Sequence, residues 1–250
     1  MADDVSPATK EPLPNLWAAG LASYAFEVRT AMGQKPMRYL LSRRFGGSEE
    51  SAVTVLFVDE PAVLSGTYVH VSENRRTGAC VVHTYLPTMA KPLRIAERLL
   101  FDCLPLTDVG YVDLMAWLPP ALRPADDGTR PAGGARSFRF DGDPAAATLW
   151  VHEQLDPGLS VVVRRVFRRD GQDVRRWEVT EPGEPGLEAL PRRIRVSRPL
   201  TGHETEFHRS SPVTAVAPAL FDGPPATLRS EIAAALEELP GRTPAYPAAG

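Results

Sequence analysis

Runs in which apolar and polar residues alternate dominate the chain between residues 37 and 209. Short runs rich in Val, Tyr, Phe and Thr come first, and turns rich in Gly, Ser and Asp separate them. A second set resumes at SFRF and ends at HETEFHRSS. Strands of a half-buried antiparallel sheet show this period, at a spacing of roughly 8–12 residues. The pattern predicts a mainly β (α+β) fold, with an antiparallel sheet of roughly nine to eleven strands curved around one or two short helices.

Turn and helix signals place a few elements more closely. NRRTG predicts a β-hairpin in which Gly78 supplies a positive φ, and RRDGQ predicts another around Asp170 and Gly171. Residues 15–32 are apolar and Ala-rich, which suggests a short helix that turns into a strand near FEVRT.

The chain is expected to form one domain with loose ends. Residues 1–14 are acidic and proline-rich and should form a flexible tail, followed by a single domain over residues 15–225. Within it, residues 119–136 are dense in Pro, Gly and Asp and predict a mobile surface loop. Residues 226–239 have Leu and Ile at helical spacing, which predicts an amphipathic helix, and residues 240–250 should fray.

The composition excludes some classes of protein. Lys and Arg number 28 against 31 Asp and Glu, for a formal net charge of −3, whereas nucleic-acid-binding domains normally carry a large basic excess. No window supplies the roughly 18 apolar residues that span a bilayer. The amino terminus lacks the basic start and the apolar run of a secretory signal. We therefore expect a cytoplasmic location, no transmembrane segment and no nucleic-acid partner.

Motifs for cofactors, metals and disulfides are missing from the sequence. No GxGxxG, P-loop, GxSxG or CxxC motif occurs, so no cofactor is expected. His203 and His208 are five residues apart in an alternating segment and should face opposite sides of a strand, so no metal site is expected. Cys80 and Cys103 are too few for a disulfide scaffold and should be reduced, half-buried thiols.

Two neighbouring predicted strands each carry a His and a Tyr on one face. Tyr68 and His70 share a face in GTYVHVS, and His83 and Tyr85 share a face in CVVHTYLP. Such residues either form cross-strand pairs on a solvated face or point into a cavity as the polar members of an apolar pocket. The sequence leaves both interpretations open.

Arginines are concentrated in VVVRRVFRRDG and DVRRWEVT. Because neighbouring residues of a strand face opposite sides, these arginines do not predict a nucleic-acid patch. We expect them to form ion pairs across strands with Glu153, Asp173 and Glu178.

Five further segments form an ordered set. They are PAVLSGTYVHVS (61–72), HTYLPTMAKPLRI (83–95), FDCLPLTDVGYVDL (101–114), VFRRDGQDVRRWEV (166–179) and LPRRIRVSRPLTGHETEFHRSSPV (190–213). In this order they resemble the P-A-D-V-x-G-T strand, the W-x-Y-L-P strand, the F-M-G-S-D-F-S-Y-E-D-L stretch, the D-G hairpin and the closing strand pair of the LolA/LolB-like bacterial lipoprotein-sorting proteins. Ser65 stands where that family often has Arg, and its export signal is not seen. We therefore expect the fold to carry over, but not the sorting role.

The resemblance implies a strongly curved, incomplete β-barrel with short plug helices and an apolar cavity for acyl chains. Which face of each strand lines the cavity stays open. The expected ligand-binding residues are Phe57, Tyr68, Val69, His70, Val71, Leu100, Phe101, Leu104, Met115 and Trp150, with Val55, Val162 and Phe167 as further members.

Two functions follow from such a cavity. The first is a cytoplasmic carrier that holds a lipophilic small molecule or an acyl, isoprenoid or polyketide chain. The alternative is a cofactor-independent tailoring enzyme, a cyclase or isomerase of the kind used in antibiotic biosynthesis, which folds an apolar substrate and moves a proton. Its candidate acids and bases are His83, Tyr85, Asp102 and Asp108. A third possible function is that of an interaction module, which binds a partner protein through the open edge of the sheet or through residues 226–239.

Overall fold

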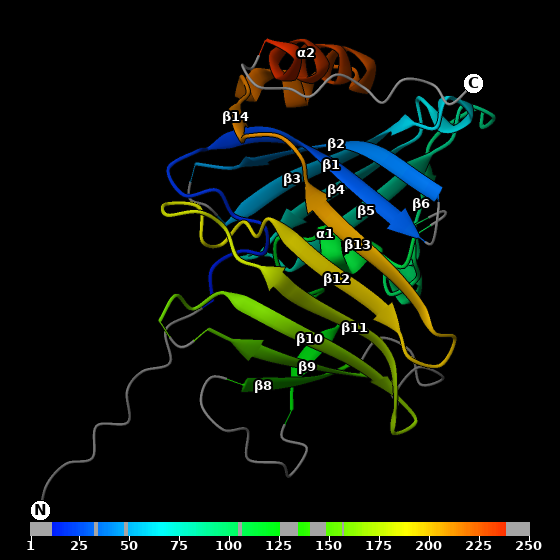
Figure 1. The fold of residues 1–250 in the computed structure, drawn as a ribbon, viewed down its shortest axis with the longest axis vertical. Coiled ribbons are helices and arrows are strands. Elements are labelled where there is room, and N and C mark those ends of the chain that lie inside the picture. Colours follow the sequence, from blue (N-terminus) through cyan, green and yellow to red (C-terminus); the bar gives the residue numbers. More distant parts are fainter. Residues whose placement is uncertain are drawn as a thin grey trace, which may run out of the picture. The chain divides into compact units, whose positions relative to one another are not determined.

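Antiparallel strands and two α-helices make up the described part of the chain (Figure 1). The computed structural model describes residues 12–32, 35–47, 50–104, 107–125, 135–140, 149–156 and 158–238. The chain divides into two compact units. One contains residues 20–95 and 207–250, and the other contains residues 1–19 and 96–206.

Six strands of the first unit, which we call the β1–β6 unit, follow the hydrogen-bonded order β6-β5-β4-β3-β2-β1. Strands that are consecutive in sequence are therefore neighbours in this sheet, and the short strand β14 also pairs with β1. The elements are β1 (Ser23–Met32), β2 (Lys35–Phe45), β3 (Ser51–Glu60), the 3₁₀ helix η1 (Ala62–Leu64), β4 (Tyr68–Asn74), β5 (Ala79–Tyr85), β6 (Leu93–Arg94), β14 (Thr214–Ala215), the 3₁₀ helix η4 (Pro218–Asp222) and α2 (Pro225–Glu237).

The second unit, which we call the β7–β12 unit, has the strand order β12-β11-β10-β9-β8-β7. Its elements are the 3₁₀ helix η2 (Glu97–Leu99), α1 (Tyr111–Leu114), β7 (Leu122–Pro124), β8 (Ala135–Phe140), β9 (Leu149–Leu155), β10 (Val162–Arg169), β11 (Gln172–Glu181) and β12 (Arg193–Arg198). Strand β13 (His203–Arg209) stands between β1 and β12 in the strand order, and its residues are divided between the two units.

The predicted mainly β fold with an open antiparallel sheet is confirmed. The strand order has two ends, β6 and β7, and the described strand pairs are antiparallel. The described residues contain 14 strands, more than the nine to eleven predicted. The difference arises because β6, β7 and β14 have only two or three residues each, which is too short for an alternating pattern to be visible.

Both predicted hairpin turns are confirmed, but the predicted amino-terminal helix is wrong. Gly78, the last of the four residues between β4 and β5, has a φ of 68°. Asp170 and Gly171, the two residues between β10 and β11, have φ values of 51° and 77°, as a tight two-residue hairpin turn requires. Residues 15–22 form turns, and β1 begins directly after them at Ser23. Pairing of its aromatic and β-branched residues with β2 outweighs the helix propensity of the neighbouring alanines.

Several predicted flexible segments fall partly outside the described residues. The predicted loop at 119–136 contains β7 and the first residues of β8, and residues 126–134 are not described. Residues 1–11 and 239–250 of the predicted tails lie outside the described ranges as well. In the part that is described, neither α-helix has the length and apolar character needed to cross a membrane.

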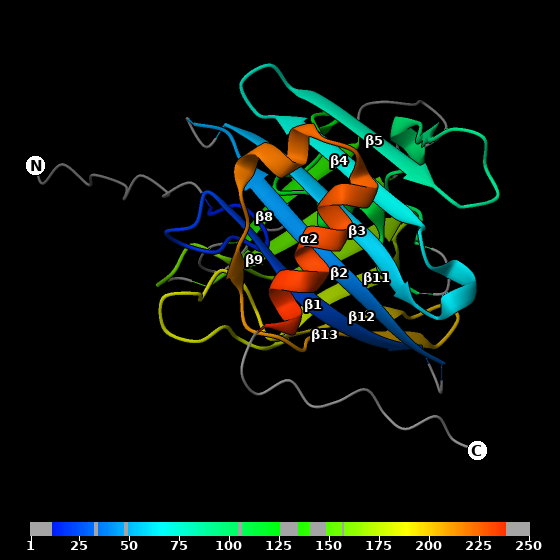
Figure 2. The same ribbon diagram turned by 90° about the horizontal axis from the view of Figure 1, so that it is seen from above.

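Helix α2 covers one face of the sheet in the β1–β6 unit. Figure 2 shows the helix lying across β1, β2 and β3. Leu228, Ile232 and Leu236 are spaced four apart, so their side chains form one apolar stripe, and all three are buried. They pack in one cluster with buried side chains of the sheet, namely Ala25, Leu40, Val55 and Phe57. The amphipathic helix predicted for residues 226–239 is therefore present and docked on its own unit.

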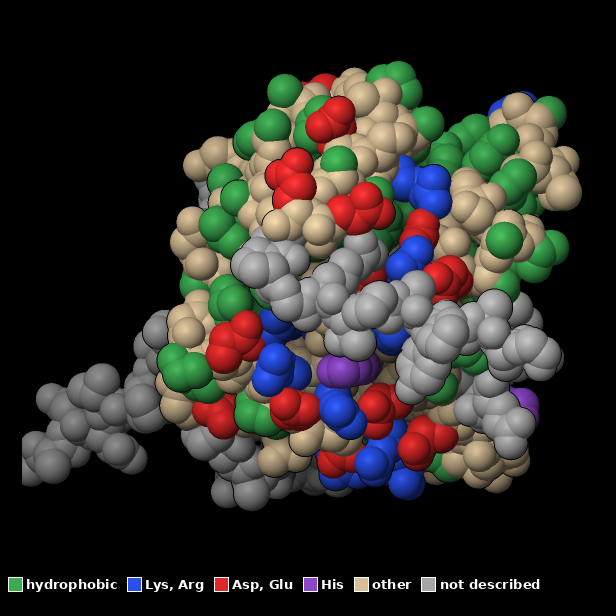
Figure 3. Space-filling model, turned by 45° about the horizontal axis from the view of Figure 1, so that its top comes forward, with side chains coloured by type: hydrophobic (Ala, Val, Ile, Leu, Met, Phe, Trp, Pro, Cys, Tyr) green, Lys and Arg blue, Asp and Glu red, His purple; other side chains and the backbone are tan. Residues whose placement is uncertain are grey.

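Exposed charges are mixed in sign. On the face shown in Figure 3, basic and acidic side chains are interspersed. In the β7–β12 unit, Arg195 lies 3.4 Å from Glu204, and Arg193 lies 3.3 Å from Glu206, across β12 and β13. Such solvent-exposed pairs stabilise a fold by less than about 1 kcal/mol each.

Shortening Ile232 should destabilise the protein through loss of packing under α2. Ile232 is fully buried, so I232A should lower the free energy of unfolding by about 2–4 kcal/mol. Urea unfolding measures the change, and E231A at the exposed neighbouring position is the matched control, with an expected effect within about 0.5 kcal/mol. Equal effects of the two substitutions would contradict the docking of α2.

Candidate functional site

The strands of the β7–β12 unit carry a buried row of apolar and charged side chains on one face. Phe167 of β10 pairs with Val151 of β9 on one side and with Arg175 of β11 on the other. Arg169, two residues after Phe167, pairs with Leu149 and shares this face. The row ends in arginines near the ends of β10 and β12.

A β-bulge in β11 brings Arg175 onto this face. Arg168 pairs with Asp173 and Phe167 pairs with Arg175, so Val174 is an extra residue without a partner of its own. A bulge bends its strand and redirects neighbouring side chains. Without the extra residue, Val174 would lie opposite Phe167 and Arg175 would point to the other face.

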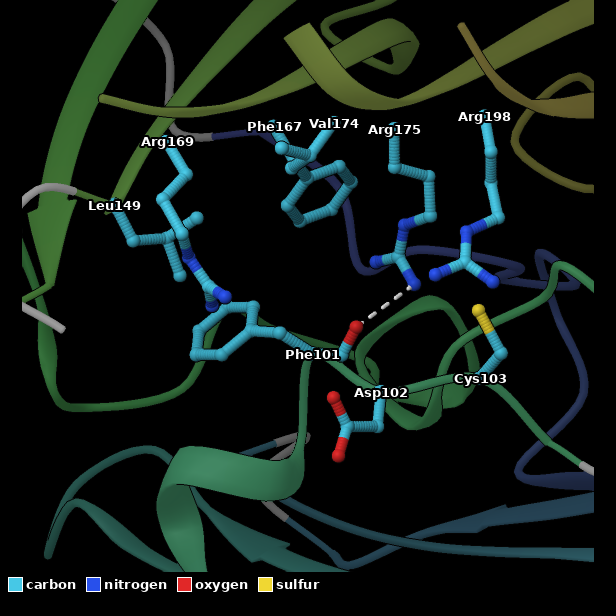
Figure 4. Close-up of a pocket in the computed structure, with 9 residues that line it drawn as sticks. All are labelled: Phe101, Asp102, Cys103, Leu149, Phe167, Arg169, Val174, Arg175 and Arg198. Atoms are coloured by element: carbon cyan, nitrogen blue, oxygen red, sulfur yellow. Dashed lines mark hydrogen bonds between the residues drawn. The ribbon is translucent and has the colours of Figure 1, made fainter. Parts of the chain in front are cut away.

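A cavity of about 250 Å³ opens where these strands meet the segment before α1. Figure 4 shows Arg175 and Arg198 side by side at one end, and Arg169 near the ring of Phe101 at the other. Arg169, Arg198 and Asp102 are exposed and mark the mouth of the cavity, whereas Leu149, Phe167 and Arg175 are buried. The lining residues are Phe101, Asp102, Cys103, Leu149, Phe167, Arg169, Val174, Arg175 and Arg198.

Aromatic packing fixes the apolar wall of this cavity. The ring of Phe101 meets the rings of Phe140 and Phe167 edge to face, at centroid distances of 5.4 and 6.3 Å. Such pairs contribute about 0.5–1.5 kcal/mol beyond the apolar area that they bury. Phe101, although only half-buried, is therefore held in place by two buried rings.

Arg175 is a buried cation with weak compensation. Its side chain is 4 % exposed, and its guanidinium carbon lies 4.1 Å from the centroid of the Phe167 ring. Its Nη2 atom is 3.5 Å from Asp113 Oδ1, and its Nη1 atom donates a long hydrogen bond of 3.4 Å to the carbonyl oxygen of Phe101. The buried Nε atom of Arg175 has no hydrogen-bond partner among the described residues.

Arg165, on the same sheet face, has a close carboxylate partner, although its buried Nη1 atom also has no hydrogen-bond partner among the described residues. Its Nε atom donates to Glu153 Oε1 at 2.6 Å, and Glu153 also contacts Arg136. Its guanidinium carbon lies 5.5 Å from the Trp177 ring centroid. Arg165 and Arg175 are about equally buried, but only Arg165 has a close carboxylate partner.

Gly110 and Asp113 set the position of Arg175. The Gly110 N–H donates to Asp113 Oδ2 at 2.7 Å and so caps α1, which leaves only the other oxygen of Asp113 for the arginine. A Cβ atom at Gly110 would overlap the Arg175 guanidinium, so a larger residue at this position would displace the arginine. The short helix and the arginine thus share one carboxylate.

The thiol of Cys103 and the carboxylate of Asp108 serve the local structure. Cys103 Sγ donates to the Asp108 carbonyl oxygen at 3.3 Å, and burial raises the pKa of the thiol despite the nearby Arg175. Asp108 is buried and accepts a hydrogen bond of 3.0 Å from the Thr205 hydroxyl. Neither group is therefore prepared as a nucleophile or a base.

The structure brings some of the predicted site residues to this cavity. Phe101 and Asp102 line it, as does Phe167. Leu100, Leu104 and Met115 are buried in the same unit but do not line it. Trp150 lies on the opposite sheet face from its neighbour Leu149 and stacks on His152 at 6.2 Å, and Val162 lines a separate cavity of about 50 Å³.

The predicted residues of the β1–β6 unit are divided between two sheet faces. Phe57 lies in the cluster under α2, and its strand partner Tyr68 packs against the same cluster. His70 is two residues beyond Tyr68 and faces the same way, whereas Val69 and Val71 point to the opposite face. Their roles in ligand binding stay predictions.

The His and Tyr side chains of β4 and β5 form two cross-strand pairs. Tyr68 lies opposite Tyr85, with ring centroids 5.2 Å apart, and His70 lies opposite His83. Burial lowers the pKa of His70, and the charges of His83 and Arg44 lower it further. In the described part of the chain, no group of three or more His, Cys, Asp or Glu side chains could hold a metal ion.

Sequence reasoning missed the three arginines of the cavity. The segment FRRDG places Phe167 and Arg169 on one strand face, which is a usable signal. Arg175 gives no such signal because its direction depends on the bulge at Val174. Arg198 is at the end of β12, where strand boundaries are hardest to predict.

Comparisons with known proteins add structural neighbours. No protein-family model matches the chain, and no curated protein matches its sequence. A DUF1329 family protein from Desulfovibrio piger superposes with a TM-score of 0.63 at 17% identity, over 80% of this chain and 88% of that one. A domain named for outer membrane lipoprotein sorting, from Vibrio parahaemolyticus, gives 0.63 at 14% identity over 80% and 89%. A LolA superfamily protein from Nitrosomonas europaea gives 0.55 at 15% identity over 82% and 91%.

Replacing the two buried arginines by methionine should have unequal effects on stability. R165M removes the more deeply buried of the two arginine partners of Glu153 and should lower the free energy of unfolding by about 3 kcal/mol. R175M removes a poorly compensated buried charge and should change stability by less than about 1 kcal/mol. Urea unfolding with unchanged m-values measures both. A larger loss for R175M than for R165M would show that Arg175 is compensated within the fold.

Protonation of His70 should make stability depend on pH. Because its pKa is lower in the folded protein than the ordinary value of about 6.5, the unfolded chain takes up the proton first. Stability should therefore fall as pH drops below about 6.5, and H70N should reduce that fall. Thermal unfolding of the wild type and of H70N between pH 7.5 and 5.5 measures this pH dependence. The same dependence of stability on pH in both proteins would contradict a contribution of His70.

Proposed function

We propose that this chain, which has a LolA/LolB-like fold, binds a lipophilic small molecule in the cavity of the β7–β12 unit and carries it unchanged. The observation that supports this most directly is the apolar wall of Phe101, Leu149, Phe167 and Val174 on one side of a cavity of about 250 Å³, whose remaining lining is polar and charged. Buried apolar side chains normally fill the space between strands and plug. In this unit the apolar side chains leave an unfilled cavity beside them.

The size of the cavity suits a small apolar ligand. At the roughly 30 Å³ that a water molecule occupies in the liquid, the cavity admits on the order of eight to ten non-hydrogen atoms. Each methylene group that leaves water contributes roughly 0.8 kcal/mol. Five or six such groups contribute about 4–5 kcal/mol, more than a few polar contacts supply.

The names of solved structures with the same fold support a role as a carrier of a lipophilic molecule. Two of them are named for lipoprotein sorting or for the LolA superfamily, although identities of 14% and 15% speak for the fold alone. The half-buried thiol of Cys103 is compatible with a reducing compartment, and the proposed location is the cytoplasm.

Binding has more support than catalysis. Of the four candidate acids and bases, only Asp102 lines the cavity, and Figure 4 shows its carboxylate pointing away from Arg175 and Arg198. His83 and Tyr85 lie on β5, and Asp108 is held by Thr205. A tailoring enzyme would have to rely on Asp102 as its acid or base among the proposed residues.

Filling the cavity should abolish binding of an apolar probe. V174W places an indole where the half-buried valine lines the cavity, and it should weaken binding of the neutral ten-carbon probe naphthalene at least tenfold. The matched control is V166W on β10, because Val166 neighbours Phe167 and faces the other side of the sheet. Fluorescence titration measures both. Unchanged binding to V174W, or no binding by the wild type, would overturn the proposed site.

A further inference from the structure

We infer that the ligand of this cavity is a lipophilic acid. Its anionic group, a carboxylate or a phosphate, lies between Arg175 and Arg198, and its apolar body lies along Phe101 and Phe167. This inference rests on the proposed function and adds the chemical class of the ligand. It is argued from the charges that surround the cavity.

The cavity lining has an excess of positive charge. Arg169, Arg175 and Arg198 carry three positive charges against the single carboxylate of Asp102, which leaves a net charge of +2 on the lining. The whole chain carries a net charge of −3, so this excess is local. A site built for a neutral apolar molecule would gain nothing from such a cluster, because unpaired cations beside apolar walls cost desolvation energy.

Two of these guanidinium groups lie next to each other. Ser197 pairs with Arg176, so the register places Arg198 beside Arg175, as Figure 4 shows. Like charges at close range repel, more strongly where the surroundings exclude water. An anion between the two guanidinium groups converts this repulsion into attraction.

Carboxylates in the described part of the chain do not neutralise the cluster. Among the described residues, Arg169 and Arg198 have no ion-pair partner, and Arg175 has only the contact of 3.5 Å to Asp113. By contrast, Arg165 on the same sheet face has Glu153 at 2.6 Å. The difference is not burial but the availability of a carboxylate. At Arg175 an anion from outside the chain completes the compensation.

The chemistry of arginine selects the ligand group. A guanidinium offers a planar fork of N–H donors that matches carboxylate and phosphate oxygens, and two forks can bind different oxygens of one group. The buried Nε atom of Arg175 is a donor still without a partner among the described residues. Phe167, stacked beneath the guanidinium, then contacts the first carbon atoms of an attached chain, and the ring of Phe101, nearer the other end of the cavity, contacts later ones.

A matched series of eight-carbon probes tests the class of ligand. Octanoate, octyl phosphate and 1-octanol share one chain length, which suits the cavity, and differ in head group. In isothermal titration of the full-length chain, at least one of the two acids should bind at least tenfold more tightly than the alcohol. R198Q should reduce the affinity for that acid at least fivefold more than it reduces the affinity for 1-octanol.

Two further variants keep the test independent of folding. R195Q removes an exposed arginine from the same strand, three residues earlier and therefore on the opposite face, and should bind like the wild type. R175M, whose stability is expected to be close to that of the wild type, should lose the preference for acids. Thermal unfolding confirms that each variant is folded before titration.

The outcomes separate this inference from the proposed function. Tighter binding of octanoate, of octyl phosphate or of both supports the inference, and the order of the two acids tells which class of acid the site prefers. Equal affinity for 1-octanol and both acids overturns the inference and leaves lipophilic binding intact. Equal weakening by R195Q and R198Q also overturns it, because the effect would then reflect net charge. Binding of none of the three probes overturns the proposed function as well.

Discussion

An extra residue in β11 directs the guanidinium of Arg175 into the interior of the β7–β12 unit. The charge of the cavity lining depends on this change of direction. The bulge at Val174 places Arg175 opposite Phe167, whose ring lies beneath the guanidinium. Moving a charge from water to such a position costs several kcal/mol unless good partners surround it. Gly110 leaves space for the guanidinium. The carboxylate of Asp113, 3.5 Å away, and the carbonyl oxygen of Phe101 compensate its charge only in part. The incomplete compensation gives the cavity its affinity for an anion.

Two buried arginines on the same face of the sheet differ in how their charge is compensated. One has a close carboxylate of the chain, and the other leaves room for an anionic ligand. At Arg165, Glu153 supplies a close carboxylate inside the fold, so this position serves stability. At Arg175, the shared oxygen of Asp113 leaves the balance open beside a cavity. A lipophilic carrier that recognises an acid needs both kinds of surface, since the apolar wall supplies affinity and the cations supply selectivity. The arrangement therefore links the fold to a chemical class of cargo.

Local patterns predicted the scaffold well because each pattern has a local cause. Alternation predicted the long strands, and Gly78, Asp170 and Gly171 predicted two hairpin turns through their tolerance of positive φ. The helix stripe of Leu228, Ile232 and Leu236 was visible for the same reason. The prediction of an amino-terminal helix was wrong because it rested on the local alanines. The pairing of β1 with β2, which decides the structure there, cannot be read from those alanines.

The cavity was only partly predictable because its cations depend on register. Phe101 came from the resemblance to the LolA/LolB-like proteins, Asp102 from the candidate acids and bases of the enzyme alternative, and Phe167 from the apolar strand rows. Pairing of Arg165 with Glu153, and of Arg168 with Asp173, agrees with the expected cross-strand ion pairs. Arg175 was assigned to the same scheme, since nothing in DVRRWEV reveals that Val174 has no strand partner. A shift of one residue reverses the face of a side chain, so a single bulge separates an ion-pair ladder from a binding site.

The position of a bound acid tests the cavity most directly. A crystal structure of the chain with octanoate should show the carboxylate oxygens within hydrogen-bond distance, about 2.7–3.2 Å, of both Arg175 and Arg198. The alkyl chain should run between Phe101 and Phe167. Octanoate bound elsewhere, or with its carboxylate turned away from both arginines, would contradict the assignment, as would a close Arg175–Asp113 ion pair in a cavity that octanoate leaves empty.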